Sequence, residues 1–65
     1  MNVKVNGQWM KFEGQTVYDL LECHGLEAKP VVVEAGGVIL DSSQWKTTRL
    51  EEGMVLEVVH LVAGG

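Results

Sequence analysis

Cys23 and His24 are the residues of this sequence best suited to nucleophilic chemistry, because a histidine can activate a nearby thiol. Neighbouring residues on a helix project about 100° apart, so these two side chains cannot face each other. His24 falls in line with Val17 and Leu21, beside the expected core. We therefore interpret Cys23 as a partly exposed thiol and His24 as the end of the inner stripe of a helix, rather than as a catalytic dyad.

The other polar residues form no pattern typical of a catalytic or metal site. The carboxylates are scattered, and Glu51-Glu52 is interpreted as a charged turn rather than an acid–base pair. Gly36-Gly37 lacks the lysine and the helix that follow a phosphate-binding loop, so it predicts a turn. His60 is interpreted as a solvated residue near a strand end. One cysteine cannot build a disulfide, an iron–sulfur cluster or a cysteine zinc site. We expect no catalytic residue, no metal and no bound cofactor.

The remaining candidate is the end of the sequence, Ala63-Gly64-Gly65, which presents an α-carboxylate on a segment with almost no side chains. Three extended residues reach at most about 10 Å, enough to enter a narrow channel of another protein. A free carboxylate with a pKa near 3.5 is anionic at neutral pH and a poor electrophile, so a partner would have to activate it. The alternative is a frayed terminus that ends in glycine by chance or as a remnant of cloning.

Length and composition limit the architecture that can position such an end. The 65 residues are 46% hydrophobic and 22% charged, which is typical of a single globular domain over residues 1–65 with a flexible Gly-Gly tail. The net charge of −4 opposes binding to nucleic acid or to an anionic membrane. We find neither a signal-peptide pattern nor an apolar run long enough to span a bilayer, so we expect a soluble, cytoplasmic protein.

Asn6-Gly7 predicts a β-hairpin, because a two-residue type I′ turn needs positive φ at both central positions. The turn fixes the register and pairs Val5 with Gln8 and Lys4 with Trp9. Alternation then places two sets of side chains on opposite faces: Met1, Val3, Met10 and Phe12 toward the core, and Lys4, Trp9 and Lys11 away from it.

Thr16 and Asp19 have the spacing of a capping box and predict the start of a helix of about two turns. Gly25 suits the left-handed residue that ends such a helix. The residues at positions i, i+3 and i+4 form an apolar stripe for the core: Val17, Leu20 and Leu21.

Pro30 prevents further helix, and Val31-Val32-Val33 predicts a strand buried on both faces. Gly36-Gly37 then separates it from Val38-Ile39-Leu40, which predicts a second hairpin. Asp41-Ser42-Ser43-Gln44 can cap a short helical turn that brings Trp45 onto the core.

Leu50-Glu51-Glu52-Gly53 predicts a turn, and residues 54–62 predict a last long strand. A lone carboxylate should not be buried, so Glu57 faces outward and Leu56 and Val58 face inward. The outward side then carries an apolar patch that is a candidate docking surface, formed by Val55, Val59, Leu61 and Trp9. Alternatively, these are scattered surface residues or are covered by a loop.

The order of elements and the ending together resemble the β-grasp fold of the ubiquitin-like sulfur carriers, in particular the ThiS family of thiamine biosynthesis. The likeness covers the whole chain and rests on Val3-Lys4-Val5-Asn6-Gly7, Thr16-Val17-Tyr18-Asp19-Leu20-Leu21, Ser43-Gln44-Trp45, Leu50-Glu51-Glu52-Gly53 and Val62-Ala63-Gly64-Gly65. Two positions depart from it. Gly36 stands where the family often has Asn, and Met54 stands where Asp commonly follows the turn.

The resemblance implies an α+β fold in which a mixed sheet of about five strands packs on one helix. It also implies a carrier rather than an enzyme. An adenylating enzyme similar to ThiF would use ATP to activate the Gly65 carboxylate, with Ala63 and Gly64 threading its active site. Sulfur from a cysteine desulfurase or another donor would then give a thiocarboxylate for a thiazole synthase similar to ThiG.

Two other interpretations stay open. One is a sulfur carrier for another client, such as the small subunit of molybdopterin synthase, which is usually longer. The other is a β-grasp interaction module whose Gly-Gly is never activated and whose apolar face merely docks. A ferredoxin is excluded, because one cysteine cannot hold its cluster.

Overall fold

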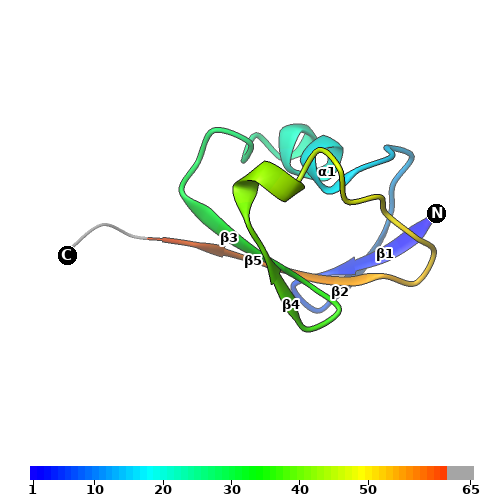
Figure 1. Ribbon diagram of the computed structural model, residues 1–65. Coiled ribbons are helices and arrows are strands. Elements are labelled where there is room, and N and C mark those ends of the chain that lie inside the picture. The colour runs from blue at the N-terminus through cyan, green and yellow to red at the C-terminus, as the bar shows by residue number, and fades with distance from the viewer. Residues whose placement is uncertain (62–65) are drawn as a thin grey trace.

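Five strands form one mixed sheet, and the helical segments pack on a single face of it (Figure 1). The computed structural model describes residues 1–61. The predicted order of elements is confirmed, and their bounds are β1 Asn2–Val5, β2 Gln8–Lys11, α1 Val17–Cys23, β3 Val31–Ala35, β4 Val38–Leu40, the 3-10 helix η1 Ser42–Gln44 and β5 Val55–His60.

The last strand lies at the centre of the sheet, whose order is β2-β1-β5-β3-β4. β5 runs parallel to β1 and antiparallel to β3. The first and last strands of the sequence therefore lie side by side in the middle of the sheet, and each hairpin supplies one of its edges. This is the predicted α+β architecture, with a five-stranded mixed sheet and one α-helix.

The first hairpin has the register that its turn predicts. Val5 pairs with Gln8 and Lys4 with Trp9. Asn6 and Gly7 have φ values of 50° and 83°, as a type I′ turn requires. Of the side chains predicted to face the core, Val3 is buried and Met10 and Phe12 pack against it, but Met1 is 40% exposed. The prediction for Met1 is wrong, because it precedes β1 and lies beyond the end of the core.

Helix α1 begins at the predicted capping box. The Thr16 side chain accepts a hydrogen bond from the Asp19 N–H at 3.2 Å, and an Asp19 carboxylate oxygen accepts one from the Thr16 N–H at 3.0 Å. The helix ends before Gly25, whose φ of 71° lies in the left-handed region that favours glycine. The predicted apolar stripe of Val17, Leu20 and Leu21 is buried.

Two predictions about strands need correction. Val31 and Val33 are buried, but Val32 is only partly buried, so β3 is not enclosed on both faces. The physical reason is that the helices cover one face of the sheet, as in an antiparallel sheet with a solvated side. The last strand was predicted over residues 54–62, yet β5 spans Val55–His60. Val62 lies outside the described residues.

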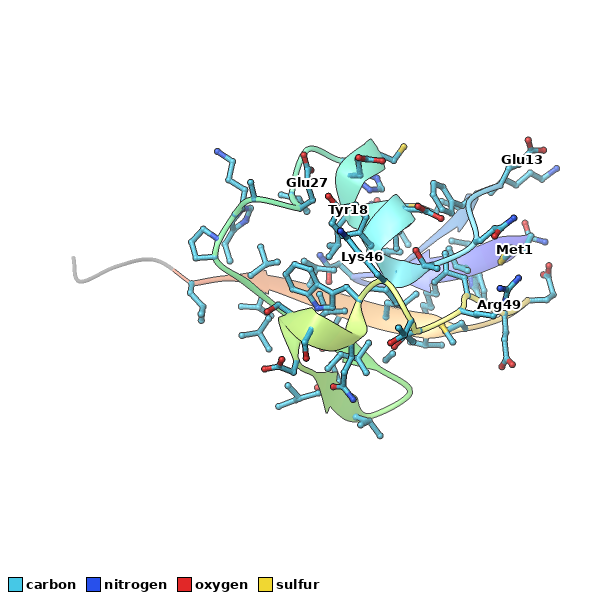
Figure 2. The ribbon with its side chains drawn as sticks, turned by 45° about the horizontal axis from the view of Figure 1, so that its top comes forward. Met1, Glu13, Tyr18, Glu27, Lys46 and Arg49 are labelled. Carbon is cyan, nitrogen blue, oxygen red and sulfur yellow. The ribbon has the colours of Figure 1, made fainter. Side chains whose placement is uncertain are left out.

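The core lies between the sheet and the two helical segments. Asp41 caps η1 by accepting a hydrogen bond from the Ser43 N–H at 3.1 Å, and Trp45 follows with only 6% of its surface exposed, as predicted. The Lys46 ammonium lies 4.7 Å from the centre of the Tyr18 ring, which joins this segment to α1 (Figure 2). The buried hydrophobic residues of the described chain are Val3, Val17, Leu20, Leu21, Val31, Val33, Trp45, Leu50 and Leu56.

Candidate functional site

The face of the sheet opposite the helices, here called the outer face, carries all four residues of the predicted docking surface. Trp9 and Val55 lie on either side of Lys4, because β1 pairs with both β2 and β5. Val59 and Leu61 follow Val55 by four and six positions, and residues an even number of positions apart in a strand point to the same side. Their exposed fractions range from 47% for Val55 to 59% for Trp9. No covering loop is seen over them in the described residues, and their contact with a partner stays a prediction.

Two further apolar residues extend this surface toward the other edge of the sheet. Val32 pairs with Val59, and Ile39 pairs with Glu34, which in turn pairs with Glu57. Residues directly opposite each other share a face, so Val32 and Ile39 belong to the outer face. Neither residue was identified from the sequence as part of the surface. The two-residue turn Gly36-Gly37 could have identified Ile39, because it pairs Ile39 with Glu34.

The charges on the outer face are unevenly distributed. Lys4 lies near one edge, where its ammonium is 5.9 Å from the centre of the Trp9 ring. Glu34 and Glu57 occupy opposite positions on β3 and β5, with Ile39 beyond Glu34. The outer face thus has a pair of carboxylates at its centre and apolar side chains on both sides of them.

The predicted reactive end, Ala63, Gly64 and Gly65, lies outside the described residues. The described chain ends at Leu61, whose N–H donates to the Pro30 carbonyl at 2.7 Å. This bond continues the pairing between β3 and β5 by one step. Leu61 is therefore held in the plane of the sheet, at the end of the outer face.

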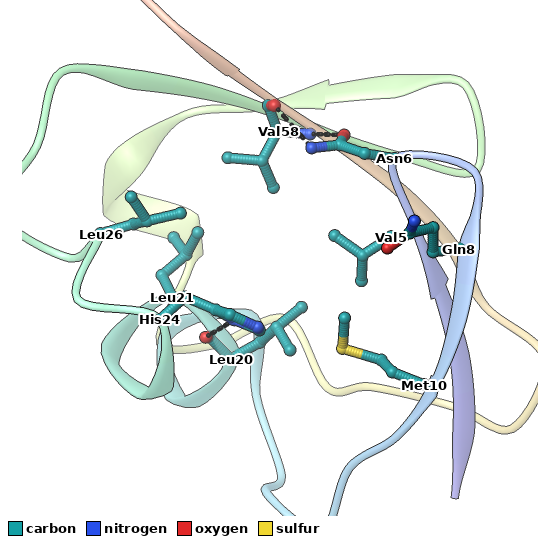
Figure 3. Close-up of a pocket in the computed structure, with 9 residues that line it drawn as sticks. All are labelled: Val5, Asn6, Gln8, Met10, Leu20, Leu21, His24, Leu26 and Val58. Atoms are coloured by element: carbon teal, nitrogen blue, oxygen red, sulfur yellow. Dashed lines mark hydrogen bonds between the residues drawn. The ribbon is translucent and has the colours of Figure 1, made fainter.

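Cys23 and His24 do not form a nucleophile–base pair. Cys23 is exposed. His24 is exposed too, and the Leu20 carbonyl accepts a hydrogen bond from its Nδ1 at 3.0 Å (Figure 3). The interpretation of His24 as a residue beside the core is only partly right. It lies at the rim of a 360 Å³ pocket between α1 and the first hairpin, which is lined by Val5, Asn6, Gln8, Met10, Leu20, Leu21, His24, Leu26 and Val58.

Asn6, another polar residue of this pocket, also uses its side chain for hydrogen bonds within the fold. The Asn6 side chain donates to the Val58 carbonyl at 3.1 Å and accepts from the Val58 N–H at 2.8 Å, which ties the hairpin turn to β5 (Figure 3). His60, opposite Val31, is exposed near the end of its strand.

The carboxylates with displaced pKa values belong to caps and turns. Hydrogen bonds from the Gln15 and Thr16 N–H groups lower the pKa of Asp19, and those from Ser43 lower the pKa of Asp41. The Asn2 N–H likewise lowers the pKa of Glu52. Within residues 1–61, no group of three or more His, Cys, Asp or Glu side chains could hold a metal ion. The same residues include no helix with the length and apolar character needed to cross a membrane.

Known proteins resemble this chain over its whole length. The model of the ThiS family matches residues 3–65. The sulfur carrier protein ThiS of Bacillus subtilis is 36% identical over 66 residues, which cover 97% of this chain and 98% of that protein. The crystal structure of the thiamine biosynthesis protein ThiS from Geobacter metallireducens matches with a TM-score of 0.84 and 29% identity, covering both chains completely. Its solution structure gives a TM-score of 0.80 and 29% identity, covering all of this chain and 88% of the other.

These matches confirm the β-grasp fold and the family that the motifs suggested. They agree with the mixed five-stranded sheet and one α-helix of residues 1–61. The chain belongs to the ThiS family.

Proposed function

We propose that this chain is a sulfur carrier of thiamine biosynthesis and that Gly65 is the residue modified. The observation that carries the proposal is the family match, which runs through Ala63, Gly64 and Gly65 to the end of the sequence. The similar Bacillus subtilis protein is named a sulfur carrier. The chain acts as a co-substrate rather than a catalyst, and partner enzymes supply the chemistry.

The chemistry follows from the poor reactivity of a carboxylate. An adenylating enzyme of the ThiF type joins the Gly65 carboxylate to AMP and releases pyrophosphate from ATP. The resulting mixed anhydride has a good leaving group. Sulfide displaces AMP and leaves a thiocarboxylate, whereas a persulfide leaves an acyl disulfide that a thiol must cleave. A thiazole synthase of the ThiG type is the proposed recipient of the sulfur. ATP is bound by the activating partner in this scheme.

In this proposal, one face of the sheet stabilises the fold and the other binds the partners. The helix-covered face holds the fold together, since the buried side chains lie on that side. The outer face is proposed to dock on the partners through Val55, Val59 and Leu61, with Trp9 at its margin. β5 links this surface to the reactive end, because it carries Val55 and Val59 and is followed in the sequence by Leu61 and then by the residues that end in Gly65.

Intact-mass spectrometry tests the proposal after incubation with a cognate adenylating enzyme, ATP and a cysteine desulfurase. We expect a mass gain equal to the exchange of one oxygen for sulfur, located at Gly65. No change in mass would leave only a docking module. Restored growth of a thiamine auxotroph that lacks its own carrier then distinguishes a thiamine carrier from a carrier for molybdopterin synthesis.

Replacing Gly64 tests the threading role of the end. We expect Gly64→Val to reduce conversion at least about tenfold, because a branched side chain obstructs a narrow channel. The variant should retain its thermal stability, since every buried residue of the described core lies between positions 3 and 56. Glu13→Val, a change of similar size far from the end, is the control. Full conversion of Gly64→Val would contradict the threading role.

A further inference from the structure

The centre of the outer face holds two glutamates at directly opposite positions, Glu34 on β3 and Glu57 on β5. The Gly36 N–H donates to the Val55 carbonyl, and the Leu61 N–H donates to the Pro30 carbonyl. In an antiparallel pair of strands, hydrogen-bonded pairs of opposite residues recur at every second position. Glu34 and Glu57 lie an even number of positions from both of these pairs, so they too are a hydrogen-bonded pair. Their Cα atoms are therefore about 5.5 Å apart.

This arrangement is unfavourable within the isolated fold. Like charges directly opposite each other in a sheet destabilise it. The strands of the pair, β3 and β5, and β4 beside β3 offer no compensation, because they contain neither lysine nor arginine. Lys4 on β1 pairs with Val55, two positions before Glu57. Its ammonium, however, lies over the ring of Trp9 on β2, which is the neighbour of β1 on the side away from β5. The fold alone thus gives no reason for the pair.

A partner that docks on this face increases the electrostatic cost of the two carboxylates unless it brings a positive charge. The pair is surrounded by the apolar side chains that are proposed to dock, with Val55 and Val59 beside Glu57 and Ile39 beside Glu34. Covering this surface with an apolar partner would remove water from two carboxylates, which is costly without a counter-charge. A metal ion is a poor solution, because no third acidic, cysteine or histidine ligand joins the pair among residues 1–61.

We propose that the adenylating partner inserts an arginine side chain between Glu34 and Glu57. A guanidinium is planar and has five donors, so it can bond two carboxylates at once, and its weakly hydrated faces suit an apolar rim. The same pair rejects partners that lack this charge, which makes it a determinant of specificity. The inference rests on the proposed function, because it names the partner chemistry of the same docking surface.

Binding of the cognate adenylating enzyme to Glu34→Gln, Glu57→Gln and the double variant tests the inference by titration calorimetry. We expect each single variant to bind about tenfold more weakly. The double variant should lose less than the product of these effects, because one guanidinium serves both carboxylates. Glu13→Gln, an exposed glutamate outside the sheet, is the matched control and should bind normally.

Thermal unfolding of the same variants separates docking from a role within the fold. We expect the unfolding temperature to stay the same or rise, because a repulsion is removed. A fall of several degrees in the unfolding temperature would assign the pair to the fold and overturn the inference, as would unchanged binding. Arg→Lys replacement of the enzyme's exposed arginines should reveal one whose effect disappears in Glu57→Gln, and the absence of any such arginine also overturns it.

Sulfur transfer to Gly65 of the chain without substitutions distinguishes the failure of this inference from the failure of the proposed function. If mass spectrometry shows sulfur on Gly65 while the glutamine variants bind normally, the arginine contact is wrong and the carrier function stands. If the unmodified chain neither binds the enzyme nor gains sulfur, both proposals fail.

Discussion

The carboxylate side chains of Asp19, Asp41 and Glu52 stabilise helix ends and turns rather than forming a catalytic site. Asp19 accepts hydrogen bonds from the Gln15 and Thr16 N–H groups at 2.9 and 3.0 Å, and Asp41 accepts them from Ser43. Glu52 accepts one from the Asn2 N–H at 2.9 Å, which joins the turn before β5 to the start of β1. Each carboxylate accepts these hydrogen bonds more strongly when it is ionised.

These carboxylates predict a loss of stability in acid. Their pKa values are lowered in the folded state from ordinary values of 3.8 for Asp19 and 4.5 for Glu52. The unfolded chain therefore binds more protons, and stability rises with pH across this range. The contribution is fully present above about pH 5 and is lost as the pH falls through the folded-state values. Urea midpoints measured from about pH 6 to pH 3 should fall, and Asp19→Asn should flatten the curve. A midpoint independent of pH would contradict this.

Among the elements, β5 contributes to both the core and the docking surface. It pairs with β1 on one side and β3 on the other, and its side chains alternate between the two faces. Leu56 is fully buried, whereas its neighbour Val55 is 47% exposed. Adjacent positions of one strand thus serve different purposes.

Alanine substitution of Leu56 and of Val55 compares how much the core side and the outer side of β5 contribute to stability. We expect Leu56→Ala to lower the free energy of unfolding by about 2–5 kcal/mol, because it leaves a cavity beneath the sheet. Val55→Ala should cost much less, since nearly half of the side chain is already in water. Urea unfolding of both variants provides the comparison, and equal losses would show that the outer face also carries the fold.

In the molecule as a whole, helices cover one face of the sheet and leave the other open (Figure 1). Residues of the outer face should therefore affect binding more than folding. The exposed apolar residues at its centre, Val55 and Val59, and the pair of Glu34 and Glu57 meet on this one surface.

A change of polarity at Val59 tests this separation. Val59→Thr keeps the branched shape that suits a strand but adds a hydroxyl group, so it should lower the affinity for the adenylating enzyme about fivefold. The free energy of unfolding should change by less than about 0.5 kcal/mol. Thr47→Val, which alters an exposed residue on the helix side, is the control for binding. A destabilised Val59→Thr with normal affinity would reverse the assignment.

Much of the fold follows from local patterns in the sequence. Asn6-Gly7, the Thr16 and Asp19 pair, and Gly25 each act through the backbone of their own few residues, so the hairpin register and the helix bounds could be predicted. Glu57 predicted the facing of the last strand, because a carboxylate avoids burial whatever the neighbouring strands are.

Other features depend on which strands become neighbours, and this follows from long-range packing. Val32 was predicted to be buried, but it stays partly open because the helices cover only one face. Glu34 and Glu57 are 23 positions apart, and only the pairing of β3 with β5 brings them together. Spacing along the chain specifies local hydrogen bonds, whereas contacts between distant segments arise only when the whole sheet buries its apolar face.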